Sequence, residues 1–269
     1  MNTLRLERDG HVGRLVLARP EKLNSFTGEM WDELRTLGQQ LLADPGDLRA
    51  LIVIGEGRAF SSGIDTSVFT TGAGIPVPDP GARDEDPAVD LVMRTQEAFS
   101  WLETVPFATI AAVRGFALGA GLQIALACDL RIFARGTSAG LLELKYGIMP
   151  DLGGTQRLPR LVGPGKAKEL IFTSARIDAE EAYRIGLCEQ LVSEEELEEA
   201  AEALAVTIAA QPPLAVKGAK RAVNAAFDER TVDGLRIEAE GQAVCLPSDD
   251  MKEAIAAFVE QRPPVYRNR

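Results

Sequence analysis

Three short, largely apolar runs constrain the fold of this chain most strongly. They are residues 51–54 (LIVI), 108–113 (ATIAAV) and 130–134 (LRIFA). Apolar runs of this length, without polar alternation, are typical of strands that are covered on both faces of a sheet. Glycine-rich turns and helical patterns separate them, and this repeated order of strand, turn and helix predicts an α/β fold with functional groups on the turns.

The remaining elements follow from local patterns. Residues 12–17 (VGRLVL) form a β-rich run that ends before Pro20. A first amphipathic helix, with Thr27 as its N-cap, is predicted from apolar residues at helical spacing: Met30, Leu34, Leu37 and Leu41. Beyond Gly163 the pattern becomes mainly helical, and Ser193 with Glu196 forms a capping box. We therefore place a boundary at residue 200, with a core over 1–200 and a helical region over 201–269.

Composition excludes several classes of function. A net charge of −11 argues against a nucleic-acid-binding surface. No run of 18 apolar residues is present and the first ten residues lack an apolar signal core, so neither a membrane span nor secretion is expected. The three cysteines have no CxxC spacing, which favours a reducing, cytoplasmic location without a zinc site. His11 is the single histidine, so a histidine-based metal site is not expected.

The stretch from Gly115 to Asp151 contains the strongest functional signal. A glycine-rich turn, with Gly119 and Gly121, precedes the apolar run 122–128. Such a turn before a helix presents backbone N–H groups that suit an anion or a developing oxyanion. The dinucleotide pattern G-x-G-x-x-G fails because residue 124 is isoleucine, and no phosphate-binding loop or serine elbow is present.

Two carboxylates in this stretch are candidate acid and base groups. Glu143 lies among leucines, and Asp151 follows Pro150 eight residues later. An apolar environment raises the pKa of a carboxyl toward neutrality, which proton transfer requires. The alternative interpretations are a surface glutamate and a turn aspartate, respectively.

The chain as a whole resembles the crotonase (enoyl-CoA hydratase/isomerase) superfamily. The resemblance lies in motifs of specific order and spacing, at residues 57–65 (GRAFSSGID), 119–121 (GAG), 127–131 (ACDLR), 153–159 (GGTQRLP) and 258–262 (FVEQR). It implies a spiral of ββα units, a C-terminal helical trimerisation region and an acyl-CoA thioester ligand. A homotrimer or a dimer of trimers is expected, with no cofactor besides the coenzyme A of the substrate.

The resemblance also assigns roles to individual residues. It places an oxyanion hole at the backbone N–H groups of Ile64 and Ala120. The residues predicted to contact coenzyme A are Arg19, Lys22, Ser62, Asp65 and Phe258. For Phe258, the alternatives are core packing and a contact made to a neighbouring chain.

Gln123 is the informative departure from the family pattern. Enoyl-CoA hydratases have a catalytic glutamate at this position and a second one at the position of Glu143. Glutamine cannot act as a base, although it can position a water or a substrate. The pair Glu143 and Asp151 looks instead like the Δ3,5-Δ2,4-dienoyl-CoA isomerase branch, whose usual aspartate at position 123 is absent here.

Three functions remain open at this point. The favoured one is an acyl-CoA isomerase in which Glu143 and Asp151 shuttle protons. The second is a hydratase that uses Glu143 with a water held by Gln123, and the third is a non-catalytic acyl-CoA-binding protein. Residues 70–90, rich in glycine, proline and aspartate, are predicted to form a loop or lid, or a simple linker.

Overall fold

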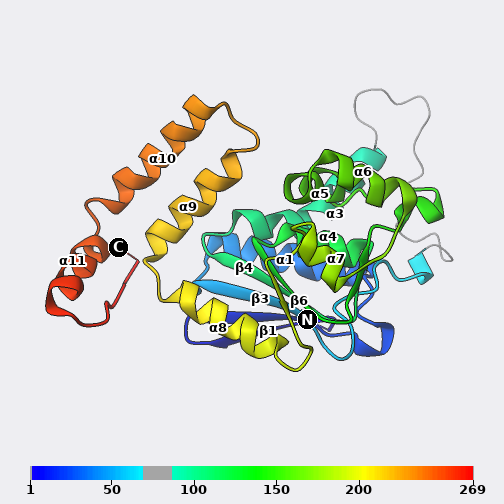
Figure 1. The fold of residues 1–269 in the computed structure, drawn as a ribbon, viewed down its shortest axis with the longest axis horizontal. Coiled ribbons are helices and arrows are strands. Elements are labelled where there is room, and N and C mark those ends of the chain that lie inside the picture. The colour runs from blue at the N-terminus through cyan, green and yellow to red at the C-terminus, as the bar shows by residue number, and fades with distance from the viewer. Residues whose placement is uncertain (1, 69–86, 269) are drawn as a thin grey trace.

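Among residues 2–68 and 87–268, which the computed structural model describes, strands from both ends of the core form one six-stranded sheet (Figure 1). Its order is β1 (Leu4–Asp9), β2 (Val12–Leu17), β3 (Ala50–Gly55), β4 (Ala108–Val113), β6 (Leu130–Ala134) and β9 (Gln190–Val192). The first pair is antiparallel and every later pair is parallel. A smaller sheet joins β5 (Phe116–Leu118), β7 (Ser138–Gly140) and β8 (Ile177–Asp178).

Both faces of the large sheet are buried, as the apolar runs predicted. In β3, Leu51 and Val53 pack into the core beneath α1 (Gly28–Ala43) and α3 (Pro87–Thr104). The alternate residues of β3 face α8 (Leu197–Ala209) on the opposite side of the sheet. Successive side chains of a strand point to opposite faces, so a strand in the middle layer must be apolar throughout.

The remaining helices form two groups. The first group is α4 (Ala120–Ala127), α5 (Gly154–Val162), α6 (Pro164–Thr173) and α7 (Ala179–Arg184), with the short 3₁₀ helices η1 (Pro20–Lys22) and η2 (Glu143–Tyr146). In this group α5 packs against α4 and α6. The helices α9 (Pro213–Ala225), α10 (Thr231–Cys245) and α11 (Asp249–Glu260) extend away from this body (Figure 1). We call these last three helices the C-terminal arm.

Most predicted element positions are confirmed. Thr27 caps α1 by accepting a hydrogen bond from the Met30 N–H, and Ser193 and Glu196 form the predicted reciprocal capping box. The predicted boundary at residue 200 falls inside α8, which packs on the sheet through Leu197 and Ala201. The division into a core and a helical region stays a prediction, and the projecting arm begins only at Pro213.

The predicted loop over residues 70–90 is wrong at its end. Residues 87–90 belong to α3, which begins at Pro87, a residue whose fixed backbone angle suits the first turn of a helix. Residues 70–86 lie outside the described part of the chain.

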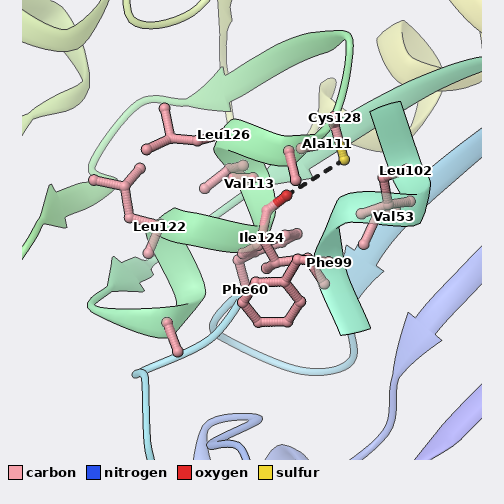
Figure 2. Packing of buried hydrophobic residues seen from close by; sticks show 14 of the residues in the cluster. Val53, Phe60, Phe99, Leu102, Ala111, Val113, Leu122, Ile124, Leu126 and Cys128 are labelled. Carbon is pink, nitrogen blue, oxygen red and sulfur yellow. Dashed lines mark hydrogen bonds between the residues drawn. The ribbon is translucent and has the colours of Figure 1, made fainter. Parts of the chain in front are cut away.

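Helix α4 is the element that positions the site. All eight of its residues are buried, because an almost wholly apolar helix is stable only within a core. Figure 2 shows Ile124 packed among Phe60, Phe99 and Leu102, with the Cys128 thiol donating to the Ile124 carbonyl oxygen at 3.6 Å. Gln123 is the one polar side chain of this helix, and its exposed fraction is 1%.

Candidate active site

Two glycine turns meet at the start of α4. A Cβ atom at Gly63 would lie 2.7 Å from the Leu118 carbonyl oxygen and 3.7 Å from the Ala120 nitrogen. Gly63 has φ +101° and Gly119 has φ +53°, so both positions need the conformational freedom of glycine. The turn around residue 63 and the turn around residue 119 therefore touch through their backbones.

Each turn has one backbone N–H that donates no hydrogen bond to any described residue. Phe26 bridges to Ile64 in parallel, with Phe26 N–H bonded to Gly63 O and Asp65 N–H bonded to Phe26 O. In such a bridge the N–H of Ile64 itself points away from Phe26. Ala120 is the first residue of α4, where no carbonyl of the helix precedes it. Within residues 2–68 and 87–268, neither N–H donates a hydrogen bond.

A small cavity of about 70 Å³ is lined by the two residues that carry these N–H groups. Ile64, Ala120 and Glu143 all line it, together with Tyr146 and Ile148. Glu143 approaches Gly119 so closely that a Cβ there would lie 3.3 Å from Glu143 Oε1. The structure thus brings together both predicted oxyanion N–H groups and one of the two predicted carboxylates.

The two oxygens of Glu143 have different environments. Oε1 accepts a hydrogen bond of 2.8 Å from the Gln123 amide. Oε2 is buried and, among the described residues, has no hydrogen-bond partner. Burial raises the pKa of Glu143, an effect that Gln123 opposes and the charge of Asp151 increases. Oε2 is therefore the atom of this site that is available to accept a proton.

Asp151 lines a different, larger cavity. This space of about 1160 Å³ has mainly apolar walls from α3, α5, α6 and residues 144–150. Ile148 lines both cavities, which makes them neighbours. Burial also raises the pKa of Asp151. Glu143 thus lines the cavity of Ile64 and Ala120, whereas Asp151 lines the neighbouring one.

The predicted coenzyme A contacts divide into two sets. Arg19 pairs with Asp65 at 3.0 Å, and Asp65 also accepts bonds from Ser25 and Ser67, whose hydrogen bonds lower the pKa of its carboxyl. The pairing of these two charges holds Asp65, next to the turn at Gly63, against residues 19–25. Ser62 lines the small cavity, and its N–H donates to the Leu23 carbonyl oxygen beside exposed Lys22.

Phe258 is not near the site of its own chain. It is 85% exposed on α11, at the far end of the C-terminal arm from α4 (Figure 1). Within one chain α11 lies away from α4, so the contact of Phe258 with coenzyme A stays a prediction. It holds only if a second copy of the chain brings its α11 to this cavity.

Sequence reasoning missed several residues of the site. The walls of the larger cavity come from helices far apart in the chain, and no local motif marks Met93, Gln96 or Phe172 as neighbours of Asp151. The anchoring of the turn at residues 151–154 by Gln123 was also missed. The one available signal was a lone polar residue in an apolar helix, which must find buried partners.

The backbone N–H pair, the buried carboxylate and the mixed α/β fold together define the crotonase class of proteins. The chain belongs to the enoyl-CoA hydratase/isomerase family, whose model matches residues 7–269. None of the helices within residues 2–68 and 87–268 is both long and apolar enough to cross a membrane.

Individual relatives agree with this membership. A short-chain-enoyl-CoA hydratase of Clostridium acetobutylicum is 36% identical over 263 residues, covering 97% of this chain and 96% of its own. The crystal structure of an enoyl-CoA hydratase from Bacillus anthracis matches with a TM-score of 0.89 and 34% identity, over 99% of this chain and 100% of its own. A Thermobifida fusca structure, in complex with acetoacetyl-CoA, matches with a TM-score of 0.80 and 36% identity, over 91% and 95%.

Proposed function

We propose that this protein moves a carbon–carbon double bond within an acyl-CoA thioester by transferring protons. The observation that supports this most is that Glu143 lines the same small cavity as Ile64 and Ala120, and that its buried Oε2 and the N–H groups of those two residues have no hydrogen-bond partner among the described residues. Removing a proton next to a thioester carbonyl places negative charge on its oxygen. Two fixed N–H donors stabilise that charge, and one donor of this kind contributes about 3–4 kcal/mol in comparable sites.

In this mechanism the thioester oxygen binds to the N–H groups of Ile64 and Ala120. Glu143 removes a proton from C2, and the enolate forms against the two donors. The acyl chain continues past Ile148 into the larger cavity, whose apolar walls suit a hydrocarbon. For a 3,5-dienoyl-CoA, protonated Asp151 returns a proton at the remote C6 there, whereas for a 3-enoyl-CoA Glu143 itself delivers the proton it has taken to C4. No metal or redox cofactor is needed, and coenzyme A is part of the substrate.

The choice of an acyl-CoA substrate is supported by the relatives. The Thermobifida fusca structure contains acetoacetyl-CoA, and its fold matches this chain over most of its length. The decisive experiment compares turnover of 2-enoyl-, 3-enoyl- and 3,5-dienoyl-CoA by the purified protein. Double-bond migration supports the proposal, whereas hydration of 2-enoyl-CoA without any migration contradicts it.

A hydratase is the second candidate, and the names of the relatives favour it. It requires Glu143 to activate a water whose second partner is Gln123. Against this, the Gln123 oxygen already accepts bonds from the Leu152 and Gly154 N–H groups, and its amide donates to Glu143. Acyl-CoA binding without turnover of any of the three substrates would instead support the third candidate, a non-catalytic acyl-CoA-binding protein.

The Asp151→Asn variant distinguishes double-bond migration in a 3,5-dienoyl-CoA from migration in a 3-enoyl-CoA. The variant keeps the shape of the side chain but cannot deliver a carboxyl proton. We expect migration in a 3,5-dienoyl-CoA to fall by about 100-fold or more, the usual scale of proton-transfer catalysis, and migration in a short 3-enoyl-CoA to change little. Steady-state rates with both substrates check this. Equal rates of dienoyl migration in the variant and the parent would remove Asp151 from the mechanism.

The pH dependence follows from burial of the two carboxyls. Because the pKa of Glu143 is raised, activity should rise with pH through an apparent pKa above about 4.3, the ordinary glutamate value. Asp151 must be protonated to donate, so dienoyl migration should fall again as pH rises through the raised Asp151 pKa. A bell-shaped profile for the dienoyl substrate and a single acid limb for the 3-enoyl substrate are expected. Identical profiles for the two substrates would contradict a separate role for Asp151.

We further propose a homotrimer, or a dimer of trimers, formed through the C-terminal arm. Its large apolar side chains are exposed, among them Val223, Leu235, Ile255 and Phe258. Light scattering coupled to size-exclusion chromatography should give three or six times the mass of one chain. A single-chain mass would contradict both the assembly and a contact of Phe258 with a neighbouring site. A cytoplasmic location stays a prediction from cysteine usage.

A further inference from the structure

The Gln123 side chain lies between three separate parts of the site. Its nitrogen donates to Glu143 Oε1 at 2.8 Å. Its oxygen accepts from the Leu152 N–H at 2.8 Å and from the Gly154 N–H at 2.9 Å. All of these groups are buried, so no solvent competes for the bonds.

The chemistry of these partners allows only one orientation of the amide. Two backbone N–H groups require an acceptor, so the oxygen must face Leu152 and Gly154. The Glu143 carboxylate requires a donor, so the nitrogen must face Glu143. Neither a carboxylate nor an apolar side chain satisfies both sides at once, which makes glutamine the matching residue.

The turn beside Gln123 is fixed at further points. Gln96 Nε2 donates to the Asp151 carbonyl oxygen at 2.6 Å, and Arg157 Nη1 donates to the Leu152 carbonyl oxygen at 2.8 Å. Gly154 is so close that a Cβ there would lie 2.9 Å from the Gln123 oxygen. The backbone that positions Asp151 is therefore attached to the same amide that holds Glu143.

We propose that Gln123 is a positioning residue, whose amide holds Glu143 through Oε1, leaves Oε2 without a hydrogen-bond partner among the described residues, and fixes the turn of Asp151 relative to Glu143. This proposal rests on the proposed function, since it assumes that Glu143 acts as the base. The prediction that Gln123 positions a water or the substrate stays a separate prediction, which would need the second N–H of its amide nitrogen, since the first donates to Glu143.

Two substitutions distinguish the bonds made by the amide oxygen, to Leu152 and Gly154, from the bond made by the amide nitrogen, to Glu143. Gln123→Glu keeps an acceptor for Leu152 and Gly154 but places a carboxyl against Glu143, so one proton must be shared or two charges must repel. The apparent pKa of Glu143 should then rise by about one unit or more, as for other carboxyl pairs. Gln123→Met removes the bonds on both sides while keeping a similar length, so the turn also loses its acceptor.

The test is a carbon-13 NMR titration of the side-chain carboxyls in the substrate-free protein, with glutamate labelled at Cδ and the Glu143 signal assigned by its loss in Glu143→Gln. We expect a higher titration midpoint for Glu143 in Gln123→Glu. We expect a lower thermal midpoint at pH 6 in Gln123→Met than in Gln123→Glu. The matched control is Gln156→Glu, which adds the same charge on the exposed side of α5 without touching Glu143.

Activity supplies the second readout. With a 3-enoyl-CoA, the acid limb of kcat should move to higher pH in Gln123→Glu by the same interval as the NMR midpoint, with KM little changed. An unchanged Glu143 midpoint in Gln123→Glu, or an equal change in the Gln156→Glu control, would overturn the positioning role. The titration needs no turnover, so a protein that shifts as expected but moves no double bond would refute the proposed function alone.

Discussion

Replacing Glu143 by glutamine is expected to lower kcat for double-bond migration by about 1,000-fold, within the 10²–10⁴ range that general acid–base catalysis contributes. Glutamine has nearly the same size, and its carbonyl oxygen can still accept the bond from the Gln123 amide that Oε1 accepts now. The small cavity and both backbone N–H groups therefore remain. Only the ability to take a proton is lost, so the KM for the acyl-CoA should change little.

The measurement compares kcat and KM for a 3-enoyl-CoA in the variant and the parent. Glu195→Gln is the matched control, because it makes the same chemical change at an exposed residue far from the cavity in the chain. A Glu143→Gln variant that keeps more than about a tenth of the parent kcat would mean that another group removes the proton. The N–H groups of Ile64 and Ala120 would then stabilise an enolate that is formed by a different base.

The sequence predicted the fold well because its strongest signals are local. An apolar run without alternation requires a strand with two buried faces, and β3, β4 and β6 lie in the middle of the sheet. Capping residues such as Thr27 and Ser193 act within three residues of their partners, so they can be recognised without knowing the fold. The resemblance to a known family then supplied the long-range arrangement that local patterns lack.

The site was predicted less completely, for a physical reason. Gln123 has partners at positions 143, 152 and 154, and only the folded chain determines which polar groups meet it. The sequence shows that a glutamine at position 123 cannot act as a base. It does not show which buried polar groups need an amide as their hydrogen-bond partner. The ion pair between Arg19 and Asp65 was likewise not predicted, and their contact with the ligand stays a prediction.

Asp151 shows how a spacing can predict proximity without predicting orientation. Eight residues separate it from Glu143, and its charge is close enough to raise the pKa of that carboxyl. The intervening segment, which includes η2 and Pro150, nonetheless places the two residues on neighbouring cavities. A shuttle between them therefore requires an acyl group long enough to pass Ile148, which links the role of Asp151 to the length of the substrate.

Gly63→Ala should lower kcat for double-bond migration nearly as much as Glu143→Gln does, although it removes no catalytic group. The new Cβ would lie 2.7 Å from the Leu118 carbonyl oxygen, so the two glycine turns must separate. The N–H groups of Ile64 and Ala120 would then no longer be held side by side, as the proposed oxyanion hole requires. Loss of one such donor costs about 10²–10³ in kcat, and we expect a decrease of at least this size.

Gly63→Ala also introduces backbone strain, because alanine at φ +101° costs about 1–2 kcal/mol. This loss of stability must be distinguished from the separation of the two turns. Gly136→Ala is the control for this strain: Gly136 has φ +80°, and a Cβ added there would meet no atom within 4 Å among the described residues. Both variants should unfold at lower temperature, whereas only Gly63→Ala should lose activity with its 3-enoyl-CoA KM largely retained. If Gly63→Ala kept its kcat while losing the same stability as Gly136→Ala, the two turns would not form the oxyanion hole, and stabilisation of the enolate would have to come from other donors.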